Sequence, residues 1–397
     1  MTNELVGALQ DNGHVVDVVL AEWQKDMAGS PEIVRGPRGE DVLVVPPIVA
    51  PWAPTLLQRV IKWFATPLKT ARAYRRHFAA RAYDGVIAGT PTMLFQPVLE
   101  RALATKAGRR PVAILFIHDF FPIHHGEIGL IPRRAAPILQ RLEERAMSNF
   151  DIIYCNLPSN IDYLKKHYHL TGERIVSWTP LWTRTEPVVT GSREEVRQRN
   201  GLALDRPIAV FGGQIIEGRG IEDMLAAADL AAEKGSDLLF LFVGSGRLAP
   251  LVDARAEQPG SNVARIAQVP REDYLGVVSA CDVGMVATVP GVSSHSFPTK
   301  TMDYLRVGIP VVVSVEPESS LASMVVEAGV GLSVPFGDVP AYLGELERAV
   351  RDEEFRRPVA DAARTFLEDV LDVDHVPAMI VRDMARVSAG EERVITR

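Results

Sequence analysis

Residues 295–310 read HSFPTKTMDYLRVGIP, and the β-branched run VVV follows at 311–313. A polar turn that leads into a short helix and then into a buried strand is the setting in which α/β proteins hold phosphorylated ligands. Pro298 suits the entrance of a helix, and Thr299 is placed to cap its first turn. The stretch therefore predicts a parallel α/β fold with a ligand site beside the turn.

Two side chains of the same stretch are placed to meet one ligand. His295 and Asp303 are separated by the turn and the first part of the helix, and Asp303 lies one helical turn beyond Thr299 on the same face. From these residues alone, an ordinary surface loop and helix accounts for the pattern as well as a ligand site does. The rest of the chain has to decide between the two interpretations.

Length and composition describe a globular protein of two domains. The chain has 397 residues, 47% hydrophobic and 23% charged, and a net charge of −7, which argues against nucleic acid as a partner. Cys155 and Cys281 lie in apolar runs, so we expect reduced, buried thiols in a cytoplasmic protein. No run of 18 apolar residues is present, and the acidic Glu4 argues against a signal peptide.

Short apolar runs alternate with helical patterns along the whole chain, which predicts two doubly wound arrays of parallel strands. Linker residues near 180–195 separate the arrays. The predicted domains are 1–185 and 186–370, with a final helix in 371–397 that packs back on the first domain. The predicted strands cover residues 14–20, 41–45, 85–88, 111–117, 151–155, 174–177, 208–211, 238–243, 263–266, 283–287, 310–314 and 331–334.

Two glycine-rich turns follow predicted strands in the second domain. Residues 211–220 read FGGQIIEGRG and lead into a helical pattern at Ile221, and residues 243–246 read VGSG. Glycine lets a backbone approach a pyrophosphate, and Arg219 can supply a bidentate counter-charge. Each turn alone is a weak signal. Because both turns and Lys300 fall at the carboxyl ends of strands in one domain, the sequence favours a phosphate-bearing ligand.

The order and spacing of these elements resemble the nucleotide-sugar domain of the family 4 retaining glycosyltransferases, which have the GT-B fold. In that family a Gly-Arg-Leu-x-x-x-Lys-Gly element binds the donor diphosphate. Residues 213–220 match it, with Gln214 in place of the arginine and Arg219 in place of the lysine. Two family glutamates fall on His295 and Asp303. The resemblance implies an α/β GT-B architecture, with two doubly wound Rossmann-like domains facing a central cleft.

The resemblance covers about residues 110–340 and implies a role for each matched position. Asp303 would bind the ribose hydroxyls, and His295, where the family has a carboxylate, would meet the donor sugar and alter its preference. Lys300 would compensate for the charge lost at Gln214. The implied donor-binding residues are Gly212, Gly213, Gln214, Gly244, Ile266, His295, Phe297, Pro298, Thr299 and Asp303, and the implied catalytic residues are His118, Arg219 and Lys300.

A histidine of the first domain follows a predicted strand. His118 comes directly after the apolar run 113–117, and family members often have a histidine here beside the donor sugar. The alternative is a structural histidine whose ring nitrogens form hydrogen bonds within its own domain. His124, His125 and Glu127 follow, but their spacing fits no standard metal site, so we expect no metal and no cofactor beyond the nucleotide-sugar.

The first domain lacks an expected element. Residues 2–20 resemble the first helix and second strand of the family, but no first strand or glycine loop precedes them. That strand is central in a doubly wound sheet, and its absence would leave buried backbone groups unpaired. Either the true start of translation lies upstream, or another segment fills the gap.

A basic amphipathic segment lies between the second and third predicted strands. From Val42 to Tyr83 there is no acidic residue, and Pro67 is expected to split this segment into two helices. A basic face beside an apolar stripe is typical of contact with anionic lipid. We therefore expect peripheral membrane contact through residues 55–82, against the alternative of a helix packed on its own sheet with a solvated basic face.

The sequence thus predicts a metal-independent, retaining glycosyltransferase that uses a UDP- or GDP-sugar. The expected acceptor is lipid-linked or a small molecule, and it belongs to cell-envelope polysaccharide or glycolipid assembly. We expect the protein to be cytoplasmic and to contact the membrane peripherally. Three alternatives stay open: a glycosyltransferase of natural-product biosynthesis, a non-catalytic glycosyltransferase-like partner protein, and a nucleotide-sugar epimerase.

Overall fold

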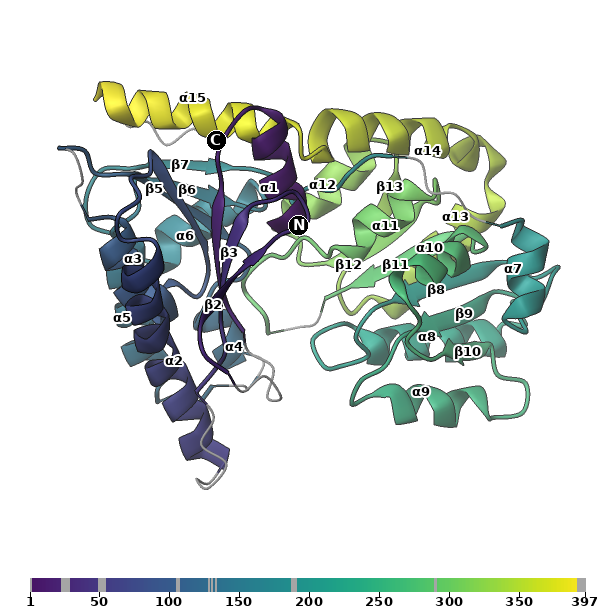
Figure 1. Ribbon diagram of the computed structural model, residues 1–397. Helices are drawn as coiled ribbons and strands as arrows, with labels where there is room; N and C mark the ends of the chain where they lie inside the picture. Colours follow the sequence, from purple (N-terminus) through teal and green to yellow (C-terminus); the bar gives the residue numbers. More distant parts are fainter. Residues whose placement is uncertain are drawn as a thin grey trace. The chain divides into compact units, whose positions relative to one another are not determined.

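The computed structural model describes residues 2–22, 29–48, 55–104, 108–127, 129, 131–132, 134–186, 191–288 and 291–390. The chain forms two compact units: unit 1 is Met1–Thr179 with Val373–Arg397, and unit 2 is Pro180–Asp372. The chain therefore leaves unit 1 once, forms all of unit 2, and returns to unit 1 for its last helix. Figure 1 shows both units.

Unit 2 is built on a parallel sheet with the strand order β10-β9-β8-β11-β12-β13. Counted from β8 along the chain, this is the 3-2-1-4-5-6 order of doubly wound folds, and the order reverses between β8 and β11. Every residue of β8, β9, β11 and β12 is buried, as a sheet covered on both faces requires. The strands are β8 (Ile208–Gly212), β9 (Leu239–Val243), β10 (Val263–Ile266), β11 (Val283–Ala287), β12 (Val311–Val315) and β13 (Gly331–Pro335).

Helices connect these strands and bury apolar side chains on the sheet. Met224 of α8 and Leu343 and Leu346 of α13 share one core with Phe240 and Phe242 of β9. The helices of unit 2 are α7 (Arg193–Arg199), α8 (Ile221–Glu233), α9 (Ala249–Ala256), α10 (Arg271–Ser279), α11 (Lys300–Arg306), α12 (Ser320–Glu327), α13 (Val339–Arg351), α14 (Glu353–Phe366) and the π-helical η2 (Leu367–Leu371).

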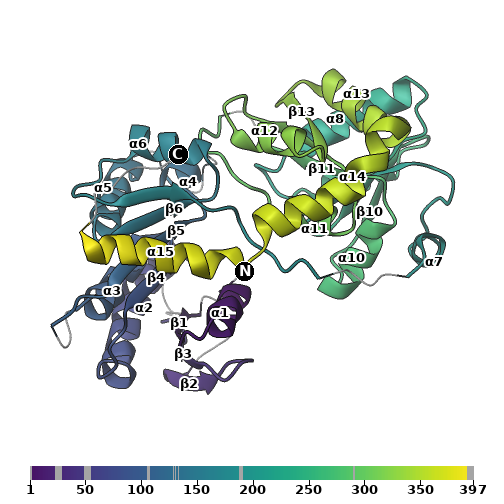
Figure 2. The same ribbon diagram turned by 90° about the horizontal axis from the view of Figure 1, so that it is seen from above.

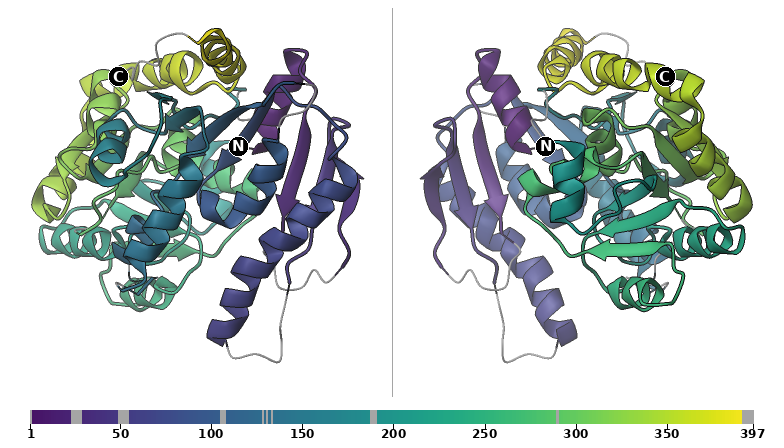
Figure 3. Two further views of the ribbon diagram at one scale, coloured as in Figure 1. Left: turned by 90° about the vertical axis from the view of Figure 1, so that its left-hand side faces the viewer. Right: turned by 90° about the vertical axis from the view of Figure 1, so that its right-hand side faces the viewer.

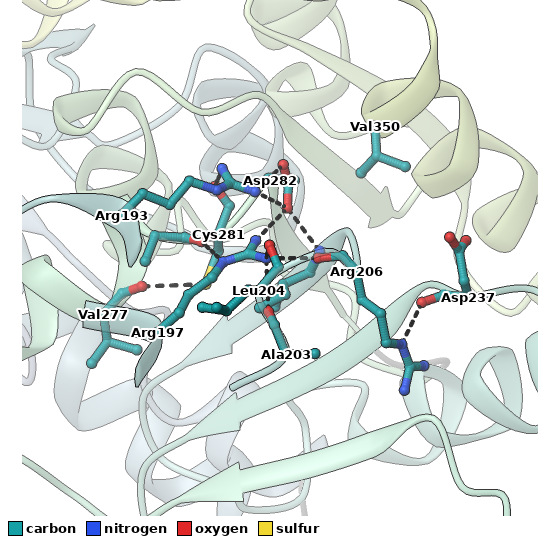
Figure 4. Close-up of polar contacts among 12 residues, drawn as sticks. Arg193, Arg197, Ala203, Leu204, Arg206, Asp237, Val277, Cys281, Asp282 and Val350 are labelled. Carbon is teal, nitrogen blue, oxygen red and sulfur yellow. Dashed lines mark hydrogen bonds and ion pairs between the residues drawn. The ribbon is translucent and has the colours of Figure 1, made fainter. Parts of the chain in front are cut away.

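A buried carboxylate fixes α7 at the amino edge of this sheet (Figure 4). Asp282 precedes β11 and accepts hydrogen bonds from Arg193 at 2.7 Å, from Arg197 at 3.0 Å and from the Ile208 amide at 2.8 Å. Arg197 is 1% exposed and also donates to backbone carbonyl oxygens, including that of Arg206 at 2.8 Å. The network joins α7, β8 and β11 on the side of the sheet away from the glycine turns.

Unit 1 contains two sheets where the sequence predicted one. A parallel sheet has the order β4-β5-β6-β7, and a second sheet has the order β1-β3-β2, with β2 antiparallel to β3. The strands are β1 (Asp17–Ala21), β2 (Glu32–Arg35), β3 (Asp41–Val45), β4 (Gly85–Gly89), β5 (Val112–Ile117), β6 (Ile152–Cys155) and β7 (Ile175–Trp178). The helices are α1 (Thr2–Asp11), α2 (Thr55–His77), the 3-10 helix η1 (Thr92–Phe95), α3 (Gln96–Ala102), α4 (Ile123–Glu127), α5 (Ala136–Met147), α6 (Ser159–His167) and α15 (His375–Ala389).

The last helix lies on unit 1, where Figure 2 shows α15 beside α1 and across β5. Its Asp383 is completely buried and accepts a hydrogen bond from the Tyr154 hydroxyl of β6 at 2.8 Å. Arg382 and Arg386 of the same helix pair with this carboxylate. A buried ion pair with a hydroxyl donor therefore attaches α15 to the sheet of unit 1.

The prediction that Pro67 splits the basic segment is wrong, because α2 runs unbroken through it. A proline inside a helix costs about 3 kcal/mol, since it removes one hydrogen bond and crowds the preceding turn. Burial of the inner helix face offsets this cost: Tyr74 packs with Leu43 of β3, and the buried Thr66 accepts a hydrogen bond from the Ile48 amide at 3.0 Å. Figure 3 shows the continuous helix beside the first sheet.

The sequence also missed one strand. The residues of β2 read EIVR, which has none of the apolar alternation that favours a strand, and all four are exposed in the structure. Its pairing with β3 comes from the turn at Gly36, whose amide donates to the Glu40 carbonyl oxygen at 2.9 Å. None of the helices in the described ranges is both long and apolar enough to cross a membrane.

Candidate functional site

The turns after β8 and β9 approach each other so closely that only glycine fits. A Cβ on Gly212 would overlap the Tyr274 side chain, and a Cβ on Gly244 would overlap the carbonyl oxygen of Gly213. The Gly213 amide donates to the Val243 carbonyl oxygen at 3.0 Å, which joins the end of β8 to the end of β9. The paired turns form bare backbone at the carboxyl edge, beside the point where the strand order reverses.

The end of β10 lies beside the two glycine turns. The Gly244 amide donates to the Ile266 carbonyl oxygen at 2.9 Å, and the Ile215 amide donates to the Ser245 carbonyl oxygen at 3.0 Å. Gln214 lies exposed between these contacts. The structure therefore brings together the two glycine turns and Ile266, all of which the sequence assigns to donor binding.

Lys300 lies directly over the turn after β8. Its Nζ is 3.3 Å from the centroid of the Phe211 ring, and its side chain passes close to Gly213. Burial lowers the pKa of Lys300 well below its usual range, and the positive charge of Arg219 lowers it further. The two cations are thus near enough to repel each other. Cations held close together beside bare backbone amides are typical of a polyanion site.

Asp303 of α11 is buried and paired. Both of its carboxylate oxygens accept hydrogen bonds from Arg271 at the start of α10, one of them at 2.8 Å. Arg271 in turn lies 5.7 Å from the centroid of the Tyr274 ring. The hydroxyl of Tyr304 accepts a hydrogen bond from the Gly212 amide at 3.0 Å, so α11 is fixed to the end of β8. These contacts place Asp303 and Lys300 beside the same turn.

The segment before α11 is half-buried. Phe297 is buried, and His295 has a pKa lowered by burial, an effect that the charge of Glu318 opposes. Thr299 occupies the N-cap position, but its side chain makes no capping hydrogen bond. Its backbone is already helical, whereas a capping residue is extended. The predicted cap is therefore wrong, and the Pro298 carbonyl oxygen instead accepts from the Thr301 amide at 2.9 Å.

His118 belongs to unit 1, whereas the other candidate residues belong to unit 2. It follows β5 and is solvent-exposed, and its ring lies against Gly89 at the end of β4. Desolvation by the surrounding protein lowers its pKa, and the Asp119 charge opposes the shift. A neutral imidazole at the carboxyl edge of a sheet can donate or accept one hydrogen bond with a ligand.

His124 and His125 lie in α4, and their rings are 5.7 Å apart. Burial and the neighbouring His124 lower the pKa of His125. Within the described ranges, no three side chains of the types that ligate metals are grouped closely enough to hold an ion.

The sequence missed two residues that shape the site, Arg271 and Tyr304. Arg271 pairs with Asp303, and the Tyr304 hydroxyl holds the turn after β8. A signal for Arg271 exists, because it follows Pro270 at a helix start just beyond a predicted strand end. Tyr304 gives no such signal, since its contact joins residues 92 positions apart.

Comparison with known proteins identifies the class. A family model described as "Glycosyltransferase Family 4" matches residues 1–180, and one described as "Glycosyl transferases group 1" matches residues 192–366. A relative from Escherichia coli strain K12, named as the colanic acid biosynthesis glycosyl transferase WcaI, is 23% identical over 403 positions that cover 96% of this chain and 95% of the relative.

Solved structures share the fold. Sucrose-phosphate synthase from Thermosynechococcus elongatus has a TM-score of 0.73 at 18% identity, with 98% of this chain and 93% of that chain covered. HepE from Anabaena, solved in complex with UDP-glucose, has a TM-score of 0.61 at 14% identity and covers 87% of this chain and 85% of its own. The fold is GT-B, and this chain belongs to the family 4 glycosyltransferases. It is a glycosyltransferase.

Proposed function

We propose that this protein transfers a sugar from a nucleoside-diphosphate sugar to an acceptor of cell-envelope polysaccharide or glycolipid assembly, with retention at the anomeric carbon. One observation carries the donor class: Lys300 lies over the bare glycine turns at the switch point of unit 2, with Arg219 near enough for its charge to lower the Lys300 pKa. The UDP-glucose complex of HepE and the role of WcaI in colanic acid biosynthesis, as their names state, support the donor and the pathway class.

Each site residue has a role in this proposal. The diphosphate lies against Gly213 and Gly244, with Arg219 and Lys300 as counter-charges. Asp303 accepts hydrogen bonds from the ribose hydroxyls, because a carboxylate has about four acceptor sites and Arg271 uses two of them. The further implied donor contacts are Gly212, Gln214, Ile266, His295, Phe297, Pro298 and Thr299.

In the transfer step the bond between the anomeric carbon and the diphosphate oxygen breaks, and the acceptor oxygen bonds to the same face of that carbon. The acceptor proton passes to the diphosphate. Charge that develops on the leaving diphosphate is stabilised by Arg219 and Lys300, which are already in place before the reaction. His118 positions the sugar. This scheme uses no metal ion and takes place in the cytoplasm.

Titration calorimetry with UDP, GDP and dTDP tests the donor site. We expect Arg219→Ala and Lys300→Ala each to weaken binding of the preferred diphosphate about 10-fold or more, and to weaken the corresponding nucleoside much less. Arg351→Ala is the matched control, because Arg351 pairs with Asp237 at the amino edge of the same sheet. Equal losses for diphosphate and nucleoside would contradict the assignment.

Retention and catalysis need a separate measurement. The protein is incubated with UDP-, GDP- and dTDP-sugars, and the released or transferred sugar is analysed by NMR. We expect this sugar to have the same anomeric configuration as it had in the donor. A protein that binds the diphosphate but neither hydrolyses nor transfers any sugar would instead be a non-catalytic partner.

The outer face of α2 supports contact with an anionic membrane. Leu57, Phe64 and Leu68 are 42%, 53% and 48% exposed and lie on one helix face. The exposed Arg72 and Arg75 continue toward the end of the helix. Apolar side chains beside cations match the boundary between headgroups and acyl chains, so the acceptor we propose is lipid-linked.

Sedimentation with liposomes tests this face. Vesicles with anionic lipid should carry the protein down, and vesicles of neutral lipid should do so far less. The double variant Phe64→Ala, Leu68→Ala should lose most of the binding, whereas Leu251→Ala, which truncates an exposed leucine of unit 2, should not. Equal sedimentation of both variants would remove the membrane proposal and leave the donor site untouched.

A further inference from the structure

The carboxyl edge of the parallel sheet in unit 1 brings three polar residues close together. In this sheet β5 lies between β4 and β6, and both pairings are parallel (Figure 2). Thr90, His118 and Asn156 are the first residues after β4, β5 and β6. The three strands end within one residue of each other in the ladder register, so these residues leave the sheet at nearly the same level. His118 therefore has a polar side chain on either side of it.

The peptide group between His118 and Asp119 is held from both neighbouring strands. On the side of β6, the Asn156 side-chain amide donates to the His118 carbonyl oxygen at 3.2 Å. On the side of β4, the Thr90 hydroxyl accepts from the Asp119 amide at 3.4 Å and donates to the Asp119 carbonyl oxygen at 2.9 Å. The backbone of His118 is therefore fixed by side chains that come from outside its own loop.

Both of these side chains are themselves anchored. Asn156 is 4% exposed, and its side-chain oxygen accepts from the Asn160 side chain of α6 at 2.6 Å. Thr90 leads into η1, where the amide and the hydroxyl of Thr92 donate to the buried Glu143 carboxylate at 2.7 and 2.9 Å. A buried carboxylate that loses its donors costs free energy, so Glu143 of α5 holds the segment that contains Thr90 in place.

The imidazole of His118 depends on this fixed backbone. The ring lies against Gly89, the last residue of β4, where a Cβ would come within 3.4 Å of the His118 Cδ2 atom. His118 as a whole is exposed, so it can still meet a ligand. A side chain on an exposed loop keeps one orientation only when its backbone is held, and a displacement of about 1 Å can slow a reaction about 100-fold.

We propose that Thr90 is a positioning residue for His118, because its hydroxyl fixes the backbone that presents the imidazole to the donor sugar. The inference rests on the proposed contact between His118 and that sugar, and it adds a residue that does not itself touch the ligand. A hydroxyl that only stabilised the loop would change Tm when removed but would leave the imidazole where it is.

Two substitutions at Thr90 separate the hydroxyl from the shape of the side chain. Thr90→Val keeps the size and the β-branch but removes both hydrogen bonds to Asp119, whereas Thr90→Ser keeps the hydroxyl. These bonds lie in an exposed part of the loop, so water can satisfy the freed groups and we expect both variants to fold. Thr70→Val is the matched control, because the Thr70 hydroxyl donates to the Thr66 carbonyl oxygen at 2.9 Å within α2.

NMR of the histidine rings tests the placement without any ligand. The ring signals of His118 in proton–nitrogen correlation spectra are assigned by their loss in His118→Ala. We expect these signals to shift in Thr90→Val and to keep their wild-type positions in Thr90→Ser and Thr70→Val. Unchanged His118 signals in Thr90→Val would overturn the proposal, whatever the activity of that variant.

Turnover shows whether the placement matters for the reaction. The substrate is the sugar nucleotide that the wild type uses best among the UDP-, GDP- and dTDP-sugars. Thr90→Val should lower kcat about 10-fold, while the affinity for the free nucleoside diphosphate stays within about 2-fold, because the proposed phosphate contacts belong to unit 2. Thr90→Ser and Thr70→Val should keep the wild-type kcat. A Thr90→Val protein with full kcat would contradict the inference.

A double variant shows whether Thr90 acts through His118. If it does, the protein with both Thr90→Val and His118→Ala should be no slower than His118→Ala alone. Additive losses would mean that Thr90 acts by another route, and would reject its positioning role. Full turnover by His118→Ala would reject it too, but would leave the transferase function standing. A wild type that turns over no sugar nucleotide would instead contradict the proposed function, and the NMR comparison would still decide whether Thr90 holds the ring.

Discussion

Lys300 shows how one residue gains its properties from contacts that no local pattern contains. A lysine at a helix start is ordinary, but here it lies against the Phe211 ring with Arg219 nearby, and its pKa falls. Asp303 was identified from its spacing, whereas its partner Arg271 was not. The sequence therefore located these charged groups of unit 2 but not the contacts that hold them in place.

The lowered pKa of Lys300 predicts a pH-dependent affinity for nucleoside diphosphates. Affinity should be constant below the lowered pKa and should fall as the pH rises through it, because the neutral amine no longer attracts the phosphates. Lys300→Arg keeps the charge at every accessible pH and should flatten the profile. Titration calorimetry with UDP from about pH 6 to 10 measures both profiles. A wild-type profile as flat as that of the variant would contradict the prediction.

The same shift affects stability with the opposite sense. Between the lowered pKa and the usual lysine value, the unfolded chain binds more protons than the folded protein does at this group. The free energy of unfolding therefore rises with pH in that window. Urea denaturation of the wild type and Lys300→Met, with the difference followed against pH, measures this contribution.

Arg271 predicts a change in nucleotide binding that separates orientation from charge. Arg271→Ala leaves Asp303 without the Arg271 guanidinium, so the carboxylate that we propose binds the ribose loses its fixed orientation. We expect the affinity for UDP to fall about 3- to 30-fold, a loss of the size expected for one charge-assisted hydrogen bond. Binding of inorganic diphosphate should change little. A matching loss for diphosphate would mean that Arg271 contacts the phosphates instead.

At the scale of elements, most helices and strands follow from apolar periodicity, and the exceptions have identifiable causes. β2 is exposed on every residue and forms because a turn returns the chain along β3. α2 continues through Pro67 because its inner face is buried. Both depend on a partner element, which local sequence does not contain.

The attachment of α7 gives a stability prediction for unit 2. Asp282→Ala leaves the buried Arg197 guanidinium without its carboxylate, and removing one partner of a buried pair costs about 3–5 kcal/mol. Asp237→Ala removes an exposed pair with Arg351 and should cost under about 1 kcal/mol. Urea denaturation followed by circular dichroism compares the two; equal costs would contradict the role of Asp282.

At the scale of the whole molecule, one of the two units is continuous in sequence and the other is not. Unit 2 is one uninterrupted segment, whereas unit 1 needs α15 from the far end of the chain. The expected boundaries near 185 and 370 lie close to the changes of unit after Thr179 and Asp372. The isolated segment Pro180–Asp372 therefore contains its complete sheet and core.

This arrangement predicts that the fragment Pro180–Asp372 folds alone and binds UDP within about 10-fold of the affinity of the whole chain, because its donor contacts are all internal. A fragment ending at Thr179 should unfold at a much lower temperature than unit 1, because it lacks Asp383 of α15. Calorimetry and thermal denaturation of the two fragments measure these outcomes.

The sequence by itself determined the α/β class, nearly all strands, the glycine turns and the cations of the candidate site, because periodicity, glycine and charge are local properties of the chain. Only the tertiary structure decided that Arg271 holds Asp303, that α2 stays whole, and that unit 1 contains two separate sheets. Each of these depends on groups far apart in the sequence, whose contact forms only when the sheets and helices pack.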